Sequence, residues 1–441
     1  MILRDRLGLE IAISESESDD YLLECAGKKL VMNNVLLSRQ VETGALSAAM
    51  PSLPLDRWDV DDTGLSESLV SKSIPILFGR PGFTVDTDGN GRLELDVLGS
   101  AFFMLSRLEE VVLSERDAHD RFPATASIAY RGGFLDRPIV DEYVEILWSA
   151  IKTIWPTAQR SRSEFSIAVS HDIDSPSYFA FTPWKILLRR AAGDWLKRGH
   201  LRQPVYELRM RLQSRRRIHP ADPYNTFHWI MDYSERMGLT STFYVVCGRN
   251  HPEFDPEYDV GHPAIRQLLR DIRDRQHSIG LHASYDTYKS AERVAAEADR
   301  LKEVCAEEGI ELPELCCRMH YLRWQTPTTV RYLHSAGISV DSTLSFADCA
   351  GFRCGTCHEY PAFDPVAGER LDVSIRPLVV MDGTIMDERY MGLGVTEAAA
   401  EAMLALKNAC RTVGGVFSLL WHNTQLVSEE QRSLYGSVLA G

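Results

Sequence analysis

Short apolar runs alternate with longer segments of helical periodicity from Phe165 onward. Short runs bounded by turn residues are typical of buried strands, whereas apolar residues three and four positions apart mark one face of a helix. Alternation of this kind predicts parallel strands, arranged as a barrel or as an open sheet. Strands are expected at 165–173, 240–247, 278–284, 316–322, 338–343, 371–380 and 416–421, and helices between them include 263–275, 291–308 and 327–336.

The part of the chain before Phe165 has the pattern of one mixed α/β domain of typical size. Apolar residues recur at helical spacing over 102–112 and 143–154, and Asp88-Gly-Asn-Gly91 predicts a hairpin or loop. No group of residues in this part is typical of a catalytic site. The polar stretch 157–164 is the expected linker. The predicted domains are therefore an accessory α/β domain at 1–157 and a second domain at 165–435.

Composition and charge place the chain among ordinary soluble proteins. Its 441 residues are 44% hydrophobic and 25% charged, and the net charge of −14 argues against general nucleic-acid binding. Charged residues come too early for a signal peptide, and there is no run of 18 apolar residues. The nine cysteines are irregularly spaced. Together these features predict a cytoplasmic protein with reduced cysteines.

One segment departs from the acidic average. Residues 185–219 contain eleven lysines or arginines and two acidic residues, a net charge of +9. Apolar residues stand among them at helical spacing, and a basic amphipathic helix can rest on an anionic membrane. Peripheral contact of 184–217 with the inner membrane is one interpretation, and a helix that packs on the protein and shows its charges to water is the other. The apolar residues are Trp184, Leu187, Leu188, Ala191 and Trp195.

Acidic residues, histidines and an arginine stand at the ends of five predicted strands. Because sites in parallel α/β folds form at the carboxyl ends of strands, these side chains are expected to share one site. A lone residue of this kind is more often structural, so the prediction rests on the convergence of all five strands. The residues are Asp172 and Asp174, His282, Arg318 with His320, Asp341, and His422.

The residue types at these positions indicate a metal-assisted hydrolase. Asp172 and Asp174 share one face of a strand, and two neighbouring carboxylates repel unless a cation or a proton neutralises one. Aspartate with one or two histidines suits Zn²⁺ with an open position for water. A spare carboxylate could act as general base and a distant histidine as general acid, in hydrolysis of an amide or ester. Solvated acids in a turn are the alternative for Asp172 and Asp174.

Five short sequences at these strand ends resemble the motifs of the NodB-type polysaccharide deacetylases, the fourth family of carbohydrate esterases. The resemblance covers 165–423 and implies a distorted (β/α)₇ barrel. The sequences are Ser170-His-Asp-Ile-Asp174, His282-Ala-Ser-Tyr-Asp286, Arg318-Met-His-Tyr321, Asp341 and Leu420-Trp-His422. The implied roles are base for Asp172, orientation of the base for Arg318, metal ligands for Asp174 and His282, acid for His422, tuning of the acid for Asp341, and substrate contact for Tyr321.

Two positions depart from the motifs of the family. Asp286 stands where the family has a second metal-binding histidine, and His320 stands where it has a proline. Asp286 could bind the metal directly, since carboxylate oxygens are acceptable Zn²⁺ ligands. His320 could instead reach in from the neighbouring strand, and we favour it because imidazole suits this class of metal. Otherwise Asp286 is a turn residue and His320 is a pocket wall.

Three further segments resemble deacetylase-like proteins of bacterial surface-polysaccharide (O-antigen) clusters, the WbmS-like branch. They are 100–110, 117–123 and 342–357. Arg353 lies in the last of them, where it could contact an acidic sugar or a phosphate, or could be a surface arginine. The same segment contains Cys354-Gly-Thr-Cys357, but only His358 lies near enough in sequence to complete a zinc site, so ordinary cysteines are favoured.

The sequence as a whole predicts a metal-dependent hydrolase that removes N-acetyl groups from a nucleotide- or lipid-linked sugar in surface-glycan biosynthesis. Asp174, His282 and His320 would hold the divalent ion, for which Zn²⁺ is the best candidate. Two alternatives stay open. One is a carbohydrate-binding module that has lost catalysis, and the other is an amidohydrolase that acts on a small cyclic amide.

Overall fold

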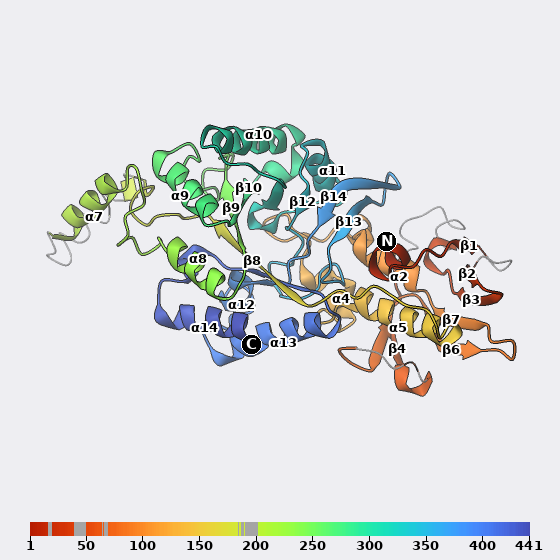
Figure 1. Ribbon diagram of the computed structural model, residues 1–441. Coiled ribbons are helices and arrows are strands. Elements are labelled where there is room, and N and C mark those ends of the chain that lie inside the picture. Colours follow the sequence, from red (N-terminus) through yellow and green to blue (C-terminus); the bar gives the residue numbers. More distant parts are fainter. Residues whose placement is uncertain are drawn as a thin grey trace.

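A nine-stranded sheet organises the C-terminal part of the chain in the computed structural model (Figure 1). The structure describes residues 1–15, 20–38, 50–63, 65, 69–183, 185–186, 189 and 202–441. All neighbouring strands of this sheet pair in parallel except β13 and β14, which are antiparallel. In spatial order the strands are β13 (Tyr360–Asp364), β14 (Glu369–Ile375), β12 (Val340–Asp341), β11 (Cys316–Met319), β10 (Ser278–Ala283), β9 (Ser241–Val246), β8 (Ser166–Ile173), β16 (Val416–Leu420) and β15 (Val380–Met381).

The sheet forms half of a barrel, with β13 and β15 at its two edges. The predicted strand 371–380 is divided between β14 and β15, because Pro377 in the connection has no N–H to donate to a ladder. The connection hydrogen-bonds on both sides: Arg376 N–H donates to the Asp341 carbonyl (2.8 Å) and Val379 N–H to Ser418 Oγ (2.9 Å). Residues 376–379, which connect β14 to β15, therefore span the opening between the two edges of the sheet.

Helices cover the outside of this sheet, with α9, α10 and α11 on one side and α8, α13 and α14 on the other (Figure 1). Local chemistry sets where they begin: Pro263 occupies the first turn of α9, and Ser428 forms a capping box with Gln431. The three predicted helices are confirmed to within two residues at each end. The helices are α8 (Phe227–Arg236), α9 (Pro263–Asp274), α10 (Ala291–Glu307), α11 (Thr328–Ser335), α12 (Asp382–Met386), α13 (Glu397–Thr412) and α14 (Glu429–Ala440).

The N-terminal part has its own sheet and its own hydrophobic core. The predicted turn at 88–91 joins the antiparallel strands β6 and β7, and the helix predicted over 102–112 is divided at Arg107, whose φ is +54°. The sheet order is β1 (Ile13–Glu15), β2 (Tyr21–Cys25), β3 (Lys28–Met32), β7 (Gly91–Leu95) and β6 (Gly79–Val85), and β4 (Asp56–Asp59) pairs with β5 (Ser73–Ile76). The helices are α2 (Val97–Leu105), α3 (Leu108–Val112), α4 (Ile128–Arg131) and α5 (Ile139–Ile154).

This part packs beside the β13 edge of the large sheet (Figure 1). Phe102 of α2 meets Phe363 of β13 edge-to-face, with ring centroids 5.3 Å apart. Short helices occur at η1 (Ile2–Arg6), η3 (Val60–Thr63), η4 (Ala124–Ala126), η5 (Thr287–Lys289), η6 (His320–Leu322) and η7 (Asn423–Gln425).

The basic segment is described only in part. Trp184, Leu187, Leu188, Ala191 and Trp195, which carry the predicted amphipathic helix, lie outside the described residues. The segment continues as helix α7 (Arg202–Gln213), which exposes Val205, Leu208 and Leu212. Among the helices of the described ranges, none has the length and apolar character needed to span a bilayer.

Candidate metal and catalytic site

The carboxyl ends of β8, β10, β11 and β16 surround one cavity of about 400 Å³. Asp172 lies in β8 and Asp174 directly after it, His282 is near the end of β10, His320 follows β11, and His422 follows β16. All five line the cavity. The strand-end rule therefore places side chains that are up to 250 residues apart in sequence around one space.

Asp174, His282 and His320 form a group that could hold a metal ion, with donor atoms all within 4.8 Å of one another. Asp174 Oδ1 lies 3.3 Å from His282 Nε2 and 3.6 Å from His320 Nε2. This oxygen is buried and accepts no hydrogen bond. A buried carboxylate oxygen without a donor is costly, and a cation would satisfy it.

Both imidazoles are held with Nε2 toward Asp174. His282 Nδ1 lies 2.9 Å from the carbonyl oxygen of Arg318, and His320 Nδ1 lies 3.1 Å from Asp255 Oδ1. Partners of this kind on the second ring nitrogen orient metal-binding histidines and fix their tautomer. Asp255 is itself fixed by the backbone N–H groups of Asn250, His251 and Tyr285. The donor set and its supports therefore fit Zn²⁺ or a similar ion.

The structure distinguishes between His320 and Asp286 as candidates for the third ligand position. His320 belongs to the group, whereas Asp286 accepts a hydrogen bond from Arg323 Nη1 at 2.8 Å and is not part of it. The predicted strand 316–322 ends at Met319, and the chain turns there into η6, with φ of +60° at Tyr321. This turn brings the His320 imidazole to the cavity.

Asp172 is placed and charged as a general base requires. Its carboxylate is buried and accepts a hydrogen bond from Arg318 Nη1 at 2.8 Å. Arg318 is fixed in turn by the carbonyl oxygen and hydroxyl of Ser342, and it lies over the ring of Tyr244. Burial by itself would raise the pKa of Asp172, but the positive charge of Arg318, together with His282 and His422, lowers the pKa. The carboxylate is therefore ionised at neutral pH. His171 points away, with Nδ1 2.7 Å from the Trp421 carbonyl oxygen.

The carboxylate beside His422 is Asp382, and the prediction that Asp341 tunes this histidine is wrong. His422 Nδ1 lies 2.7 Å from Asp382 Oδ1, and the His422 backbone N–H donates to Asp382 Oδ2. Asp341 instead accepts hydrogen bonds from the backbone and hydroxyl of Thr343, and burial raises its pKa to about 6. Asp382 comes two residues after the predicted strand 371–380, so the strand-end rule could have found it.

Replacing Asp382 with asparagine is expected to move the alkaline limb of the pH profile of kcat/KM to lower pH by at least about one unit. Burial lowers the pKa of His422, but Asp382, with smaller contributions from Asp174 and Asp172, raises it to about 10. A general acid is lost as pH rises through its pKa, so removal of the carboxylate shortens the active range from the alkaline side. Asp382→Glu should restore part of the range, and an unchanged profile in Asp382→Asn would count against the pairing.

The N-terminal part contributes to the wall of the cavity. Arg121 lines the cavity, where its Nη1 donates to the carbonyl oxygen of Tyr321 (3.0 Å) and its Nη2 to the hydroxyl of Tyr390 (3.2 Å). Tyr321 itself lines the cavity, as expected for a residue that contacts substrate, and lies close to Phe254. Nothing in the local sequence around Arg121 indicated this position, because the contact joins segments about two hundred residues apart.

Arg353 does not reach the cavity, so the prediction that it contacts substrate is wrong. Its side chain is buried, with Nε 2.9 Å from Glu110 Oε1 and Nη1 2.7 Å from the carbonyl oxygen of Ser345. Arg107 also donates to Glu110. The segments 100–110 and 342–357 therefore meet in one buried network of charges that joins the two parts of the chain. A buried arginine must be paired, and Glu110 supplies the partner.

Comparison with known proteins gives one family and several solved structures. Residues 1–156 match a family described only as a family of unknown function (DUF7033). No curated protein matches the chain. Among similar structures is a protein assigned as a polysaccharide deacetylase from Mycobacterium smegmatis, with 17% identity over 64% of this chain and 85% of that chain and a TM-score of 0.41.

Two other structures resemble the chain to a similar extent. Puue allantoinase has 11% identity over 65% of this chain and 85% of its own, with a TM-score of 0.37. A protein assigned as a polysaccharide deacetylase from Pseudomonas aeruginosa PAO1 has 11% identity over 63% of this chain and 84% of its own, with a TM-score of 0.37. These identities and scores are low, so the function proposed below rests on the side chains of the site.

Proposed function

We propose that this protein is a metal-dependent hydrolase that removes N-acetyl groups from a sugar during bacterial surface-glycan biosynthesis. One observation carries the proposal. A group of three potential metal ligands, Asp174, His282 and His320, shares a cavity with an arginine-paired carboxylate, Asp172, and a carboxylate-paired imidazole, His422. Zn²⁺ is the ion that best suits this donor set.

Each side chain has a role in hydrolysis that its contacts support. An ion bound by the three ligands would polarise the acetyl carbonyl and lower the pKa of a water molecule to about 7. Asp172 would accept a proton from the attacking water, and its ion pair with Arg318 stabilises the ionised carboxylate that this role requires. His422, whose Nε2 lies 3.5 Å from Asp174 Oδ2, donates a proton to the departing amine, and Asp382 holds its ring in place.

The walls of the cavity suit a sugar derivative. Phe254, Tyr321 and Tyr390 present aromatic surface. Arg121 and Arg389 add guanidinium groups, each held by an ion pair with a neighbouring aspartate. An aromatic ring offers an apolar face with a polar edge, and an arginine fork matches a phosphate or carboxylate. These walls and the motif resemblance support an N-acetylated sugar, carried by a nucleotide or a lipid, as the substrate. The proposal includes a fold of the distorted (β/α)₇ type, which the motif resemblance implies, and a site of action in the cytoplasm.

Acetate release from N-acetylated sugars tests the proposal directly. The purified protein should release acetate, lose this activity after chelation, and regain it when Zn²⁺ is added in stoichiometric amount. A small cyclic amide offered in parallel distinguishes the other kind of amidohydrolase. Hydrolysis of the cyclic amide alone would contradict deacetylation. Stoichiometric metal without hydrolysis of any N-acetylated sugar in a broad panel would favour a binding module.

Peripheral membrane contact through 184–217 would suit a lipid-linked substrate. In α7, Val205, Leu208 and Leu212 are 44–68% exposed on a segment that is rich in arginine. Apolar residues of this kind can enter an interface while basic residues meet anionic headgroups. The unmodified protein should float with anionic vesicles at low salt. A smaller fraction of the Leu208→Ser/Leu212→Ser variant should float under the same conditions. Val366→Ser, at an exposed site elsewhere, is the control. No flotation at low salt would refute the contact.

A further inference from the structure

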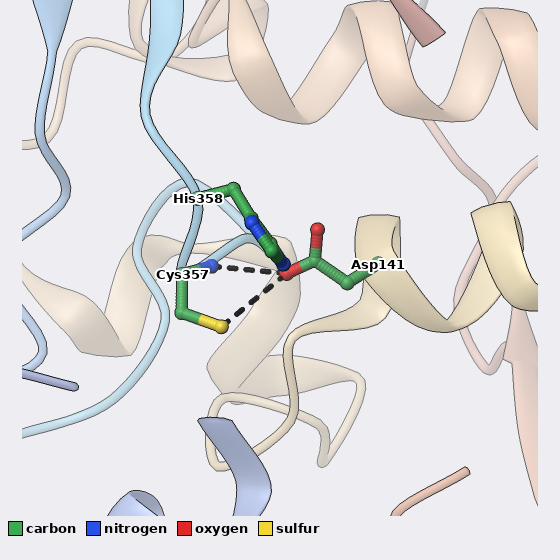
Figure 2. Close-up of side chains that lie close together, drawn as sticks. All are labelled: Asp141, Cys357 and His358. Atoms are coloured by element: carbon green, nitrogen blue, oxygen red, sulfur yellow. Dashed lines mark hydrogen bonds between the residues drawn. The ribbon is translucent and has the colours of Figure 1, made fainter. Parts of the chain in front are cut away.

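A second group of potential metal ligands lies outside the catalytic cavity, where the two parts of the chain meet. Asp141 is in the first turn of α5, and Cys357 and His358 lie shortly before β13. Their donor atoms are all within 4.8 Å of one another, and all three residues are buried. Figure 2 shows the three side chains pointing toward a common point.

The spacing of these atoms suits a tetrahedral ion. Cys357 Sγ lies 3.5 Å from Asp141 Oδ2. With Zn–S of about 2.3 Å and Zn–O of about 2.0 Å, tetrahedral geometry also places the sulfur and oxygen about 3.5 Å apart. Little movement of these two side chains would be needed to admit the ion.

The surroundings hold Asp141 and leave one of its oxygens toward the group. Asp141 Oδ1 accepts from Thr356 Oγ1 at 2.9 Å and lies 3.2 Å from Arg6 Nη2. The other oxygen, Oδ2, faces Cys357 and accepts hydrogen bonds from the Cys357 backbone N–H and from Thr356 Oγ1, both at 3.0 Å. Carboxylates that bind metals are usually fixed in this way by partners on the second oxygen.

Space for the sulfur and the imidazole depends on a glycine. A Cβ atom at Gly415 would lie 2.1 Å from Cys357 Sγ and 3.2 Å from His358 Nε2. His358 Nε2 lies 3.3 Å from the Val413 carbonyl oxygen, a long contact that the nitrogen would exchange for the ion.

We propose that Asp141, Cys357 and His358 bind a zinc-class ion that holds α5 against the segment before β13. A mixed set of thiolate, imidazole and carboxylate ligands suits Zn²⁺ or Co²⁺ and disfavours Mg²⁺ and Ca²⁺. His358 and Arg6 line two surface cavities of about 370 and 310 Å³, which offer a route for the ion.

This site can be distinguished from the catalytic one by spectroscopy, because only this group contains a cysteine. The unmodified protein loaded with Co²⁺ should show a thiolate-to-cobalt charge-transfer band in the near ultraviolet. Asp174→Ala, which alters the catalytic group, should keep the band. Cys357→Ala should lose the band while keeping one metal ion per chain. Cys354→Ala, at a neighbouring buried cysteine outside the group, is the matched control.

The outcomes divide cleanly. Two zinc ions per chain in the unmodified protein and one in Cys357→Ala or His358→Ala would support the site. Absence of the band in the cobalt-loaded unmodified protein, or its persistence in Cys357→Ala, would overturn it. Should the cysteine variant fail to fold, the spectrum and the zinc content of the unmodified protein decide the question alone.

Discussion

Replacing Asp172 with asparagine is expected to lower kcat for acetate release by about 10²- to 10⁴-fold while leaving the metal content unchanged. This range is typical for loss of a general base. Asparagine has the same shape and can still accept a hydrogen bond from Arg318, but it cannot take a proton from water. The measurement is steady-state acetate release, together with metal analysis of the same preparation.

Retained metal is the control within this experiment, because it separates lost chemistry from a lost site. The melting temperature should stay close to that of the unmodified protein. Acetate release at the unmodified rate would show that Asp172 is not the base. Loss of metal together with activity would instead place Asp172 among the ligands.

Replacing Asp174 with alanine should remove both the metal of the catalytic cavity and turnover. Asp174 is the carboxylate of the group, and its Oδ1 faces both imidazoles. An ion that stabilises the transition state by about 4 kcal/mol accounts for about a 10³-fold loss of rate on its removal. The measurements are metal content and kcat in a buffer to which no metal is added.

Asp286→Ala is the matched control for this loss. Asp286 is an aspartate four residues from His282, but it pairs with Arg323 and lies outside the group. This variant should keep the metal, because none of the three ligands changes. Loss of metal in Asp286→Ala with retention in Asp174→Ala would reverse the assignment of the ligands.

Much of the fold follows from periodicity. The helices that begin at Pro263 and Ala291 were predicted to within two residues, because proline, serine caps and apolar spacing are all local signals. The strand predicted over 371–380 was too long because a proline in its middle interrupts the ladder. The order of the strands in the sheet depends on hydrogen bonds between distant segments, which no local pattern describes.

Part of the candidate site could also be predicted from local sequence patterns. Asp172, Asp174, His282, His320 and His422 stand at the ends of recognisable strands, and parallel strands bring such ends together. Asp382 follows a strand of only two residues and was not predicted, and the motif resemblance gave its role to Asp341. Asp255 and Arg121 come from irregular segments, and only the folded chain shows where they lie.

The sequence alone could not show that the Arg353 side chain is buried. A loop with glycines after a strand is a common place for an arginine that contacts substrate, and the sequence around Arg353 gave no sign of its partner. That partner, Glu110, lies 243 residues earlier in the chain. Similarly, the Cys-x-x-Cys pattern drew attention to Cys354, whereas the structure groups Cys357 with His358 and the distant Asp141.

The central claim is that Asp174, His282 and His320 bind one metal ion beside Asp172. A crystal structure of the zinc-loaded protein, with anomalous diffraction data collected at the zinc edge, tests it most directly. The account predicts an anomalous peak about 2.0–2.2 Å from a carboxylate oxygen of Asp174 and from Nε2 of both histidines. An empty cavity in protein that shows zinc-dependent acetate release, or a peak bound by Asp286 in place of His320, would contradict it.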